Sequence, residues 1–362
     1  MGEADSGPRM VSVLDSINPR SYASSLLLLQ MQLYNKINLA RQQNSINADL
    51  NQNINSINLE ADKWRKLKSN LWDSINFISE AVTRAESIQN KLEAMSITAY
   101  SAQNGDATSS ATYPIQFDVA LRGINSQAID SRKSPNILSS NNSDYTYITN
   151  INGATDTVSR QFLGADYTIT DTGGNIWVRD RGSFVLRQYD ANYVKTGKFA
   201  ALTGGVRLDS ISGNTVTFTT DYNSTSAQQF TGTLATSGLG LLDAWLYEDL
   251  TTSAGRTRAL TDVHQAQAQV QAGIAQLNGD RAVAQYNLDR ASLKVGVSLN
   301  AIDATTKSHM LKLQEVQATN GQQNAISAMI VNGTINIRNE YLNLLKLSYG
   351  SGLARSLIDI LA

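Results

Sequence analysis

The chain has 362 residues, enough for two or three domains at the usual size of about 100–200 residues each. Its 30 Lys and Arg balance 31 Asp and Glu, so the formal net charge is −1 and gives no electrostatic basis for binding nucleic acid or an anionic membrane. There are no cysteines and two histidines, His264 and His309, which excludes disulfides, thiolate metal sites, cysteine nucleophiles and a histidine-rich metal site. Charged residues make up 17%, against about 25% in ordinary domains, and such a surface is weakly protected against self-association.

The first predicted element is a long helix over 19–100. No proline follows Pro19 in this region and no glycine occurs before Gly105. Apolar residues recur at spacings of three and four, the pattern of a helix with one buried seam. The predicted seam is Leu71, Ile75, Ile78, Val82, Ala85, Ile88, Leu92, Met95 and Ala99. A weaker seam is predicted upstream, at Leu26, Leu33, Ile37 and Ala40. Trp64 and Trp72 are predicted to pack inside the bundle.

The middle part, about 108–240, predicts a short helix over 113–128 and then antiparallel hairpins. Turn sequences such as Gly173-Gly174-Asn175 and Gly213-Asn214 separate short β-branched or alternating runs, which is typical of hairpins. Aromatic residues in this region are interpreted as its own core, with a sugar-stacking surface as the alternative. They are Trp177, Phe184, Tyr189, Tyr193, Phe199, Phe218 and Tyr222.

The third part, about 241–362, is predicted to be helical again. Its stripe contributes Val270, Ile274, Leu277, Leu288 and Val295 to the bundle seam. Gly321 and Gly333 are expected to interrupt the pattern weakly, before a last helix that begins near Ile335.

The order of long helix, β insert and long helix predicts an α+β fold. Neither helical part can bury its stripe alone, so we expect the two to pair as a long antiparallel coiled-coil bundle, with the β-rich domain inserted at the far end. The predicted domains are a terminal helical core (1–48 and 305–362), a helical-bundle wall (49–140 and 241–304) and a β-rich outer domain (141–240).

Both ends of the chain are rich in apolar residues that a two-helix hairpin cannot hide. Exposed apolar stripes indicate a partner, and contacts between copies that do not close on themselves generate a filament. The predicted assembly interface is Leu26, Leu29, Leu33, Ile37, Leu342, Leu345, Leu353, Leu357 and Ile360.

Several segments resemble the bacterial flagellin family. Residues 75–95 (INFISEAVTRAESIQNKLEAM) and 102–105 (AQNG) look like the second long helix of flagellins, which carries an A-x-x-A-E-x-x-L/I-Q pattern. Weaker likenesses follow in the family's order on both sides of the β insert. They lie at 125–127 (NSQ), 135–139 (PNILS), 259–266 (ALTDVHQA) and 279–288 (GDRAVAQYNL).

The chain departs from the family pattern near its ends. Residues 39–49 (LARQQNSINAD) keep only a trace of the R-L-S-S-G-x-R-I-N-x-A-x-D-D segment, and the glycine after R-A-x-L has no counterpart near Ala284. The apolar end over 344–362 differs in sequence from flagellin ends. The terminal polymerisation region is therefore divergent.

The resemblance implies a structural subunit of an extracellular bacterial flagellar filament that serves motility. It would be exported through a type III channel without a cleaved signal peptide, polymerise with itself, and have an export chaperone, junction and cap proteins as partners. Two alternatives stay open: a hook–filament junction or type III secretion tip protein, and an adhesin-like binding module on a helical stalk. No run reaches the roughly 20 apolar residues that span a bilayer.

The residues that could act in catalysis or bind a cofactor form no recognisable site, so we expect neither an enzyme nor a cofactor. His264 and His309 are expected to face solvent on helices. Scattered acidic residues in the turn-rich part lack the spacing of a calcium loop, and the Gly-Gly pairs lack the context of a phosphate loop. These are Asp171, Asp180, Asp190 and Asp209, with Gly173-Gly174 and Gly204-Gly205.

Overall fold

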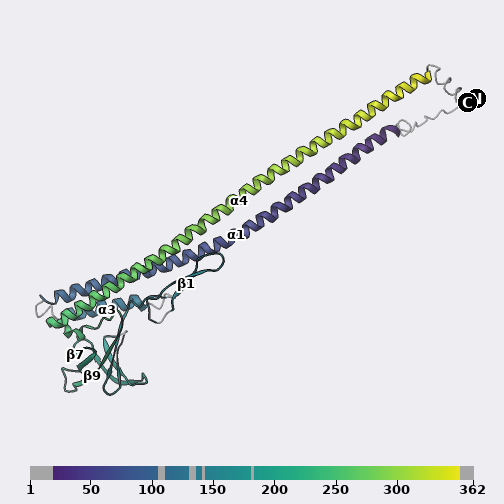
Figure 1. The fold of residues 1–362 in the computed structure, drawn as a ribbon. Helices are drawn as coiled ribbons and strands as arrows, with labels where there is room; N and C mark the ends of the chain where they lie inside the picture. The colour runs from purple at the N-terminus through teal and green to yellow at the C-terminus, as the bar shows by residue number, and fades with distance from the viewer. Residues whose placement is uncertain (1–18, 105–110, 130–135, 141–142, 181–182, 351–362) are drawn as a thin grey trace, which may run out of the picture. The chain divides into compact units, whose positions relative to one another are not determined.

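The structure is a computed structural model that describes residues 19–104, 111–129, 136–140, 143–180 and 183–350. Within these described residues, the elements in chain order are a long helix, a short helix, nine strands, a 3-10 helix and a second long helix (Figure 1). Contacts divide the chain into two units, residues 1–62 with 295–362 (unit 1) and residues 63–294 (unit 2). The three-domain division drawn from the sequence stays a prediction.

The long N-terminal helix α1 runs over Pro19–Ser101, within one residue of the predicted end. Pro19 suits a first helical position because its missing N–H has no partner to lose there. The long C-terminal helix α4 runs over Ser253–Gly350 and begins where Thr252 Oγ1 accepts the Gly255 N–H at 3.0 Å. The expected interruption at Gly321 and Gly333 is wrong, since α4 continues through both. A helical glycine costs only about 1 kcal/mol, too little to stop a long helix.

The start of the predicted third helical part is also wrong. Residues 241–243 are not helical, and Ala244–Leu250 form the 3-10 helix η2. Glu248, Asp249 and Leu250 have positive φ values of 56°, 52° and 57°, so the chain makes a left-handed turn that an α-helix cannot contain.

In unit 1, the helical segments 19–62 and 295–350 run antiparallel. Asn35 contacts Asn324 and Asn47 contacts His309, so residue numbers rise along α1 as they fall along α4. The less exposed positions on α1 define the inner face, and they are Leu28, Met31, Asn35, Asn38, Leu39, Gln43, Ile46 and Leu50.

The predicted upstream seam is therefore in the wrong phase. Leu26, Leu33, Ile37 and Ala40 are exposed, and Leu28 lies on the inner face instead. The run from Leu26 to Leu29 is apolar on every side of the helix, so its periodicity fits either phase.

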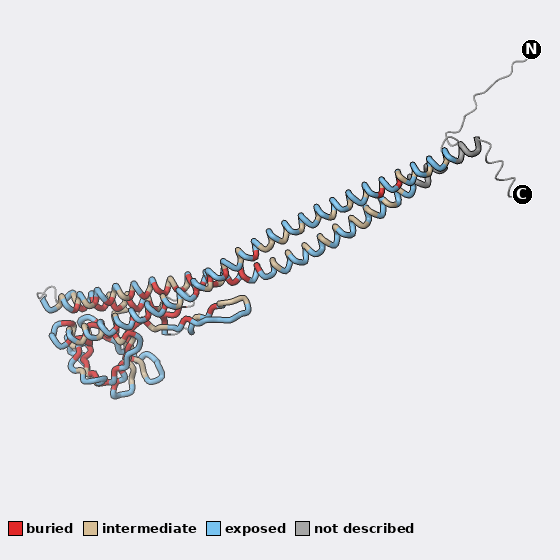
Figure 2. The backbone as a smooth tube through the Cα atoms, turned by 45° about the horizontal axis from the view of Figure 1, so that its top comes forward, coloured by how far each residue is buried: buried red, intermediate tan, exposed pale blue. Residues whose placement is uncertain are grey.

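In unit 2, α1, α3 (Tyr113–Ile129) and α4 share a core (Figure 2). The short helix predicted over 113–128 is confirmed as α3. Its buried stripe contains Phe117, Leu121 and Ile124. The Arg84 side chain on α1 donates from Nε to the backbone oxygen of Gln127, at 2.9 Å, near the end of α3. Trp64 is buried as expected, but Trp72 is 58% exposed and does not pack inside the bundle.

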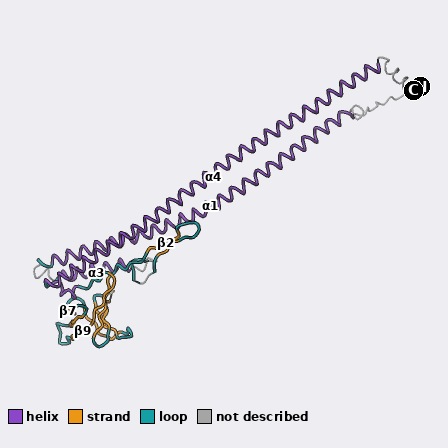
Figure 3. Tube along the Cα trace, viewed as in Figure 1, coloured by secondary structure: helices purple, strands orange, loops and turns teal. Residues whose placement is uncertain are grey.

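The β region has a two-stranded hairpin and a seven-stranded antiparallel sheet (Figure 3). The hairpin is β1 (Tyr145–Ile148) and β2 (Thr155–Val158). The strand order of the sheet is β6-β5-β4-β3-β9-β8-β7, with β3 and β9 as central neighbours. Its strands are β3 (Ala165–Asp171), β4 (Ile176–Asp180), β5 (Val185–Tyr189), β6 (Lys195–Ala201), β7 (Val206–Ser212), β8 (Thr215–Thr220) and β9 (Gln228–Gly238).

The predicted hairpin at Gly173-Gly174-Asn175 is confirmed as the β3–β4 turn, with Gly174 at φ +79°. Asp171 organises this turn, because its Oδ1 accepts the backbone N–H groups of Gly173 and Asn175, both at 2.9 Å. Burial alone would raise the pKa of the Asp171 carboxyl. The hydrogen bonds from Asn175, Trp177 and Gln188 outweigh burial and lower it.

The sheet encloses an aromatic core. The Trp177 ring on β4 lies 5.4 Å from that of Phe218 on β8 and 4.8 Å from that of Phe230 on β9. Trp245 of η2 closes the group, 5.6 Å from Phe218. Of the aromatics predicted as core, Trp177 and Phe218 are buried. Phe184, Tyr189 and Tyr222 are half-buried, and Tyr193 and Phe199 are exposed.

Two helical glycines of α4 predict different responses to alanine. A Cβ at Gly279 meets nothing within 4 Å, so Gly279→Ala should stabilise the protein by about 1 kcal/mol through helix propensity. A Cβ at Gly273 would collide with Gln161 Oε1, and Gln161 would lose its 2.9 Å hydrogen bond to Gln276. We expect Gly273→Ala to gain less by about 1 kcal/mol. Thermal unfolding followed by circular dichroism measures both, and equal gains would contradict the close approach of Gln161.

Candidate assembly surface

The first candidate surface is a row of exposed leucines and an isoleucine on α1 in unit 1. Leu26, Leu29, Leu33 and Ile37 recur at spacings of three and four, so they share one side of the helix. Leu29 is 62% exposed and Leu33 is 57% exposed. We call these four residues the α1 stripe.

A second row lies on α4 and was not predicted in this position. Ile326, Met329, Ile330, Ile337, Tyr341 and Leu344 are all more than half exposed, and we call them the α4 stripe. Met329 is 72% exposed, although methionine and isoleucine are usually buried. Helical spacing alone could have found this stripe, because residues 326, 330, 337, 341 and 344 recur at intervals of four, seven, four and three.

Charge is absent from most of this part of α4. No Asp, Glu, Lys or Arg occurs from residue 316 to residue 337, a run of 22 residues. Asn, Gln, Ser and Thr supply the remaining polar groups. A helical surface of this kind has apolar area to bury and carries no repulsive charge against a similar helix.

The inner face between the two helices of unit 1 is partly polar. Asn35 Nδ2 donates to Asn324 Oδ1 at 2.9 Å, and Asn324 Nδ2 donates to Asn320 Oδ1 at 3.0 Å. Asn320 Nδ2 donates to the backbone oxygen of Asn35 at 3.0 Å. Amide pairs between helices fix the register at some cost in stability. The apolar side chains that would stabilise this pair more strongly face outward instead.

The remaining predicted interface residues lie at the end of α4 or beyond it. Leu342 is half-buried. Leu345 belongs to α4, and its side chain lies outside the described set. Leu353, Leu357 and Ile360 lie outside the described residues.

The predicted bundle-seam residues are mostly buried. Val295 belongs to unit 1 and is half-buried, as is Ile274 in unit 2. The others are buried: Leu71, Ile75, Ile78, Val82, Leu92, Val270, Leu277 and Leu288. Coiled-coil pairing itself stays a prediction.

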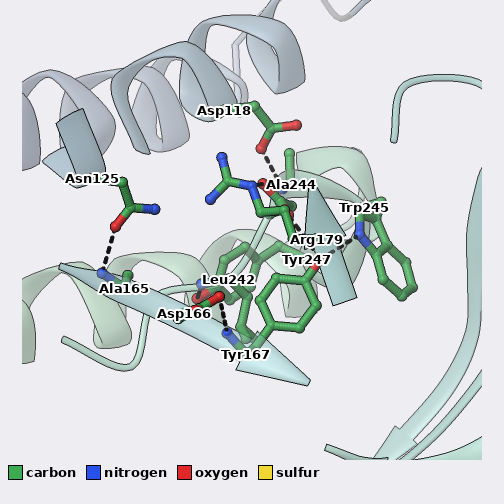
Figure 4. Close-up of polar contacts among 11 residues, drawn as sticks. Asp118, Asn125, Ala165, Asp166, Tyr167, Arg179, Leu242, Ala244, Trp245 and Tyr247 are labelled. Atoms are coloured by element: carbon green, nitrogen blue, oxygen red, sulfur yellow. Dashed lines mark hydrogen bonds and ion pairs between the residues drawn. The ribbon is translucent and has the colours of Figure 1, made fainter. Parts of the chain in front are cut away.

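A buried polar network joins the sheet to η2 and to the residue before it in unit 2 (Figure 4). Arg179 Nε on β4 lies 3.1 Å from Asp243 Oδ1, and these two side chains are 5% and 0% exposed. Tyr167 on β3 donates its hydroxyl to Asp243 Oδ2 at 2.7 Å. Trp245 Nε1 donates to the Tyr167 hydroxyl at 3.2 Å. We call this group the η2 network.

Sequence reasoning missed the η2 network. The available signal was Asp243 inside the apolar run Leu241-Leu242-Asp243-Ala244-Trp245, since a buried carboxylate is rarely found without a partner. Burial raises the pKa of the Tyr167 phenol well above its usual value, and the charge of Asp243 raises it further. The phenol therefore stays a hydrogen-bond donor.

Candidate chemistry is sparse elsewhere. Among the described residues, no group of three His, Asp or Glu side chains is placed to hold a metal ion. His264 is exposed, and a His309 ring nitrogen lies 2.9 Å from Asn47 Oδ1. Within the described part of the chain, no helix has the length and apolar character needed to cross a bilayer.

Comparison with solved structures finds flagellar junction proteins at low similarity. No family model matches the chain, and no curated protein matches it. The crystal structure of the flagellar junction protein FlgL from Legionella pneumophila is 12% identical, with a TM-score of 0.28, over 76% of this chain and 99% of that one. FlgL from Xanthomonas campestris is 11% identical, with a TM-score of 0.19, over 75% and 99%. Likenesses this weak establish neither a shared fold nor a shared activity.

Proposed function

We propose that this chain is a structural subunit of a bacterial flagellar assembly and that it binds other subunits through the α1 and α4 stripes. The observation that carries the proposal is the charge-free run 316–337, in which Ile326, Met329 and Ile330 are each more than half exposed. A lone protein gains nothing from exposing such residues, whereas their burial between subunits would contribute about 25 cal/mol per Å² of apolar surface. The role is mechanical and needs no catalyst or cofactor.

Within this class we place the hook–filament junction role first and the bulk filament role second. The N-terminal helix resembles flagellin over residues 75–95, but residues 39–49 keep only a trace of the family's characteristic segment. A subunit that joins two unlike structures needs terminal contacts that differ from those of a filament subunit. Export without a cleaved signal and a location outside the cell belong to the same proposal.

The bulk filament role is favoured by a separate observation. Apolar stripes lie on both α1 and α4, and a subunit inside a long polymer has neighbours on several sides. The adhesin role has less support, because Trp177 and Phe218 are committed to the core and only Tyr193 and Phe199 stay exposed.

Electron microscopy with sheared bacterial flagella separates these roles. One sample of the purified chain is concentrated, seeded with salt-precipitated material and viewed alone in negative stain. A second sample is gold-labelled, mixed with flagellar filaments and viewed in the same way. The junction role predicts small oligomers and gold at filament ends. Long uniform filaments of the chain alone would replace the junction role with the filament role. A folded chain that stays monomeric and binds no filament would overturn both.

A further inference from the structure

Asp118 is a buried carboxyl of α3 that holds a peptide group from a distant part of the chain. Its side chain is 1% exposed, and its Oδ1 accepts the backbone N–H of Ala244 at 2.7 Å, across 126 residues of sequence. Figure 4 shows this bond beside the Arg179 guanidinium. The bond fixes the first residue of η2 against α3.

Asp243 is the residue directly before that peptide group. Its carboxylate has the Arg179 guanidinium at 3.1 Å and the Tyr167 hydroxyl at 2.7 Å. One buried carboxyl, that of Asp118, therefore accepts this N–H, and a second, that of Asp243, belongs to the residue before it. The two carboxyls have unequal partners. Asp243 has a cation and a hydroxyl donor, whereas Asp118 accepts from a neutral backbone donor.

The other charged groups around the pair do not remove this imbalance. Arg122 on α3 acts on Asp243, and its guanidinium lies over the Phe184 ring, 3.2 Å from the centroid. Asp249 in η2 adds negative charge near Asp118, and Asp166 on β3 adds it near Asp243. If both members of the pair were ionised, two buried negative charges would share the guanidinium of Arg179, since Arg122 has the smaller effect and acts on Asp243.

We propose that Asp118 and Asp243 form a proton-operated latch that holds η2 and the sheet against α3. The latch is closed when Asp118 carries a proton and Asp243 is ionised against Arg179. Loss of the Asp118 proton to solvent leaves two buried carboxylates that act on each other near the Asp243–Ala244 peptide. Their repulsion and the cost of burying a second charge open the contact.

The sign of the pH dependence follows from the pKa of the pair. Burial raises the pKa of Asp118 well above its usual value, and the negative charge of Asp243 raises it further. The closed state thus holds a proton that the open state releases. The free energy that favours the closed state over the open state is largest below the ordinary pKa of aspartate. It decreases as the pH rises from there toward the raised pKa of Asp118. One linked proton makes the ratio of open to closed molecules rise about tenfold per pH unit in that window.

Hydrogen exchange of the Ala244 amide tests the latch directly, because that N–H is donated to Asp118. Exchange in the full-length protein is followed against pH and corrected for the intrinsic rate. The wild type should show the tenfold rise per pH unit within the window. Asp118→Asn keeps an acceptor oxygen but carries no charge, so its ratio of open to closed molecules should not depend on pH. At a pH above the raised pKa of Asp118, this ratio should be lower in the variant than in the wild type.

A matched control is Asp73→Asn, which removes an exposed carboxylate of α1 in the same unit. It should reproduce the wild-type pH dependence of Ala244 exchange.

A second measurement is the ¹³C chemical shift of the Asp118 carboxyl, which should titrate at a pH above the ordinary range of aspartate. A titration within the ordinary range, or Ala244 exchange with the same pH dependence in wild type and Asp118→Asn, would overturn the proposal.

Discussion

Replacement of Ile330 by glutamate is expected to weaken association of the chain with other subunits by at least about a hundredfold. Ile330 is 55% exposed on the α4 stripe, so the free protein loses little by the change. In an assembly that buries this position, the variant would lose about 2 kcal/mol of apolar burial and would bury an unpaired carboxylate. Sedimentation velocity over a concentration series measures the effect.

Gln317→Glu is the matched control for Ile330→Glu, because position 317 does not share the three- and four-residue spacing of the α4 stripe. It places the same charge in the same charge-free run of α4, at an exposed position that is polar to begin with. Its association should stay within about threefold of wild type, since an exposed charge is largely screened by solvent. Equal weakening by both variants would show that α4 tolerates no added charge at all. That result would remove the case for a specific stripe.

Replacement of Arg179 by methionine is expected to cost about 3–5 kcal/mol of folding free energy, because it removes the cation that contacts the buried Asp243 carboxylate. The cost should fall at acidic pH. Burial raises the pKa of Asp243, and without Arg179 the carboxyl can accept a proton and become neutral. The variant therefore loses stability as pH rises from acid to neutral. Chemical denaturation at several pH values, followed by tryptophan fluorescence, measures this loss.

The double variant Arg179→Met with Asp243→Asn separates the lost charge pair from lost packing. With no charge left at position 243, more than half of the lost stability should return, and the pH dependence should weaken. If the double variant were as unstable as Arg179→Met alone, packing of the arginine stem would account for the loss and the buried ion pair would not.

The sequence predicted the helices and hairpins that are marked by a few neighbouring residues. α1 was placed because Pro19 marks its start and no glycine occurs between Pro19 and Gly105. The β3–β4 hairpin followed from two adjacent glycines between β-branched runs. These features depend on a few neighbouring residues, so tertiary contacts did not alter them.

Features that depend on distant residues could not be read from the sequence. The phase of α1 near Leu28 is set by Asn35 meeting Asn324, a pairing across 289 residues. The Asp118 contact with Ala244 spans 126 residues, and an Asp on an amphipathic helix is ordinarily a solvent-facing residue. Exposure of Trp72 depends on which side of α1 its neighbours occupy.

Exposure of the α1 stripe has a local cause, although Leu26, Leu33 and Ile37 were also predicted in the buried upstream seam. The role of the stripe in assembly stays a prediction. Four leucines in succession exceed what one helix face can bury, so some had to remain outside whichever phase was adopted. Most of the α4 stripe lies upstream of Leu342, where the predicted interface on this helix begins, and so the sequence-based prediction did not include it.

Protection of a single cysteine at position 329 tests the assembly surface most directly. The chain has no cysteine, so Met329→Cys gives one reactive thiol on the α4 stripe, and Ser224→Cys gives a matched thiol in an exposed turn of the β region. Maleimide labelling rates are compared between free chain and chain bound at flagellar filament ends or in its own oligomers. We predict that binding slows labelling at position 329 at least about tenfold and leaves position 224 unchanged. Equal rates at position 329 in free and bound chain would contradict assembly through the stripe.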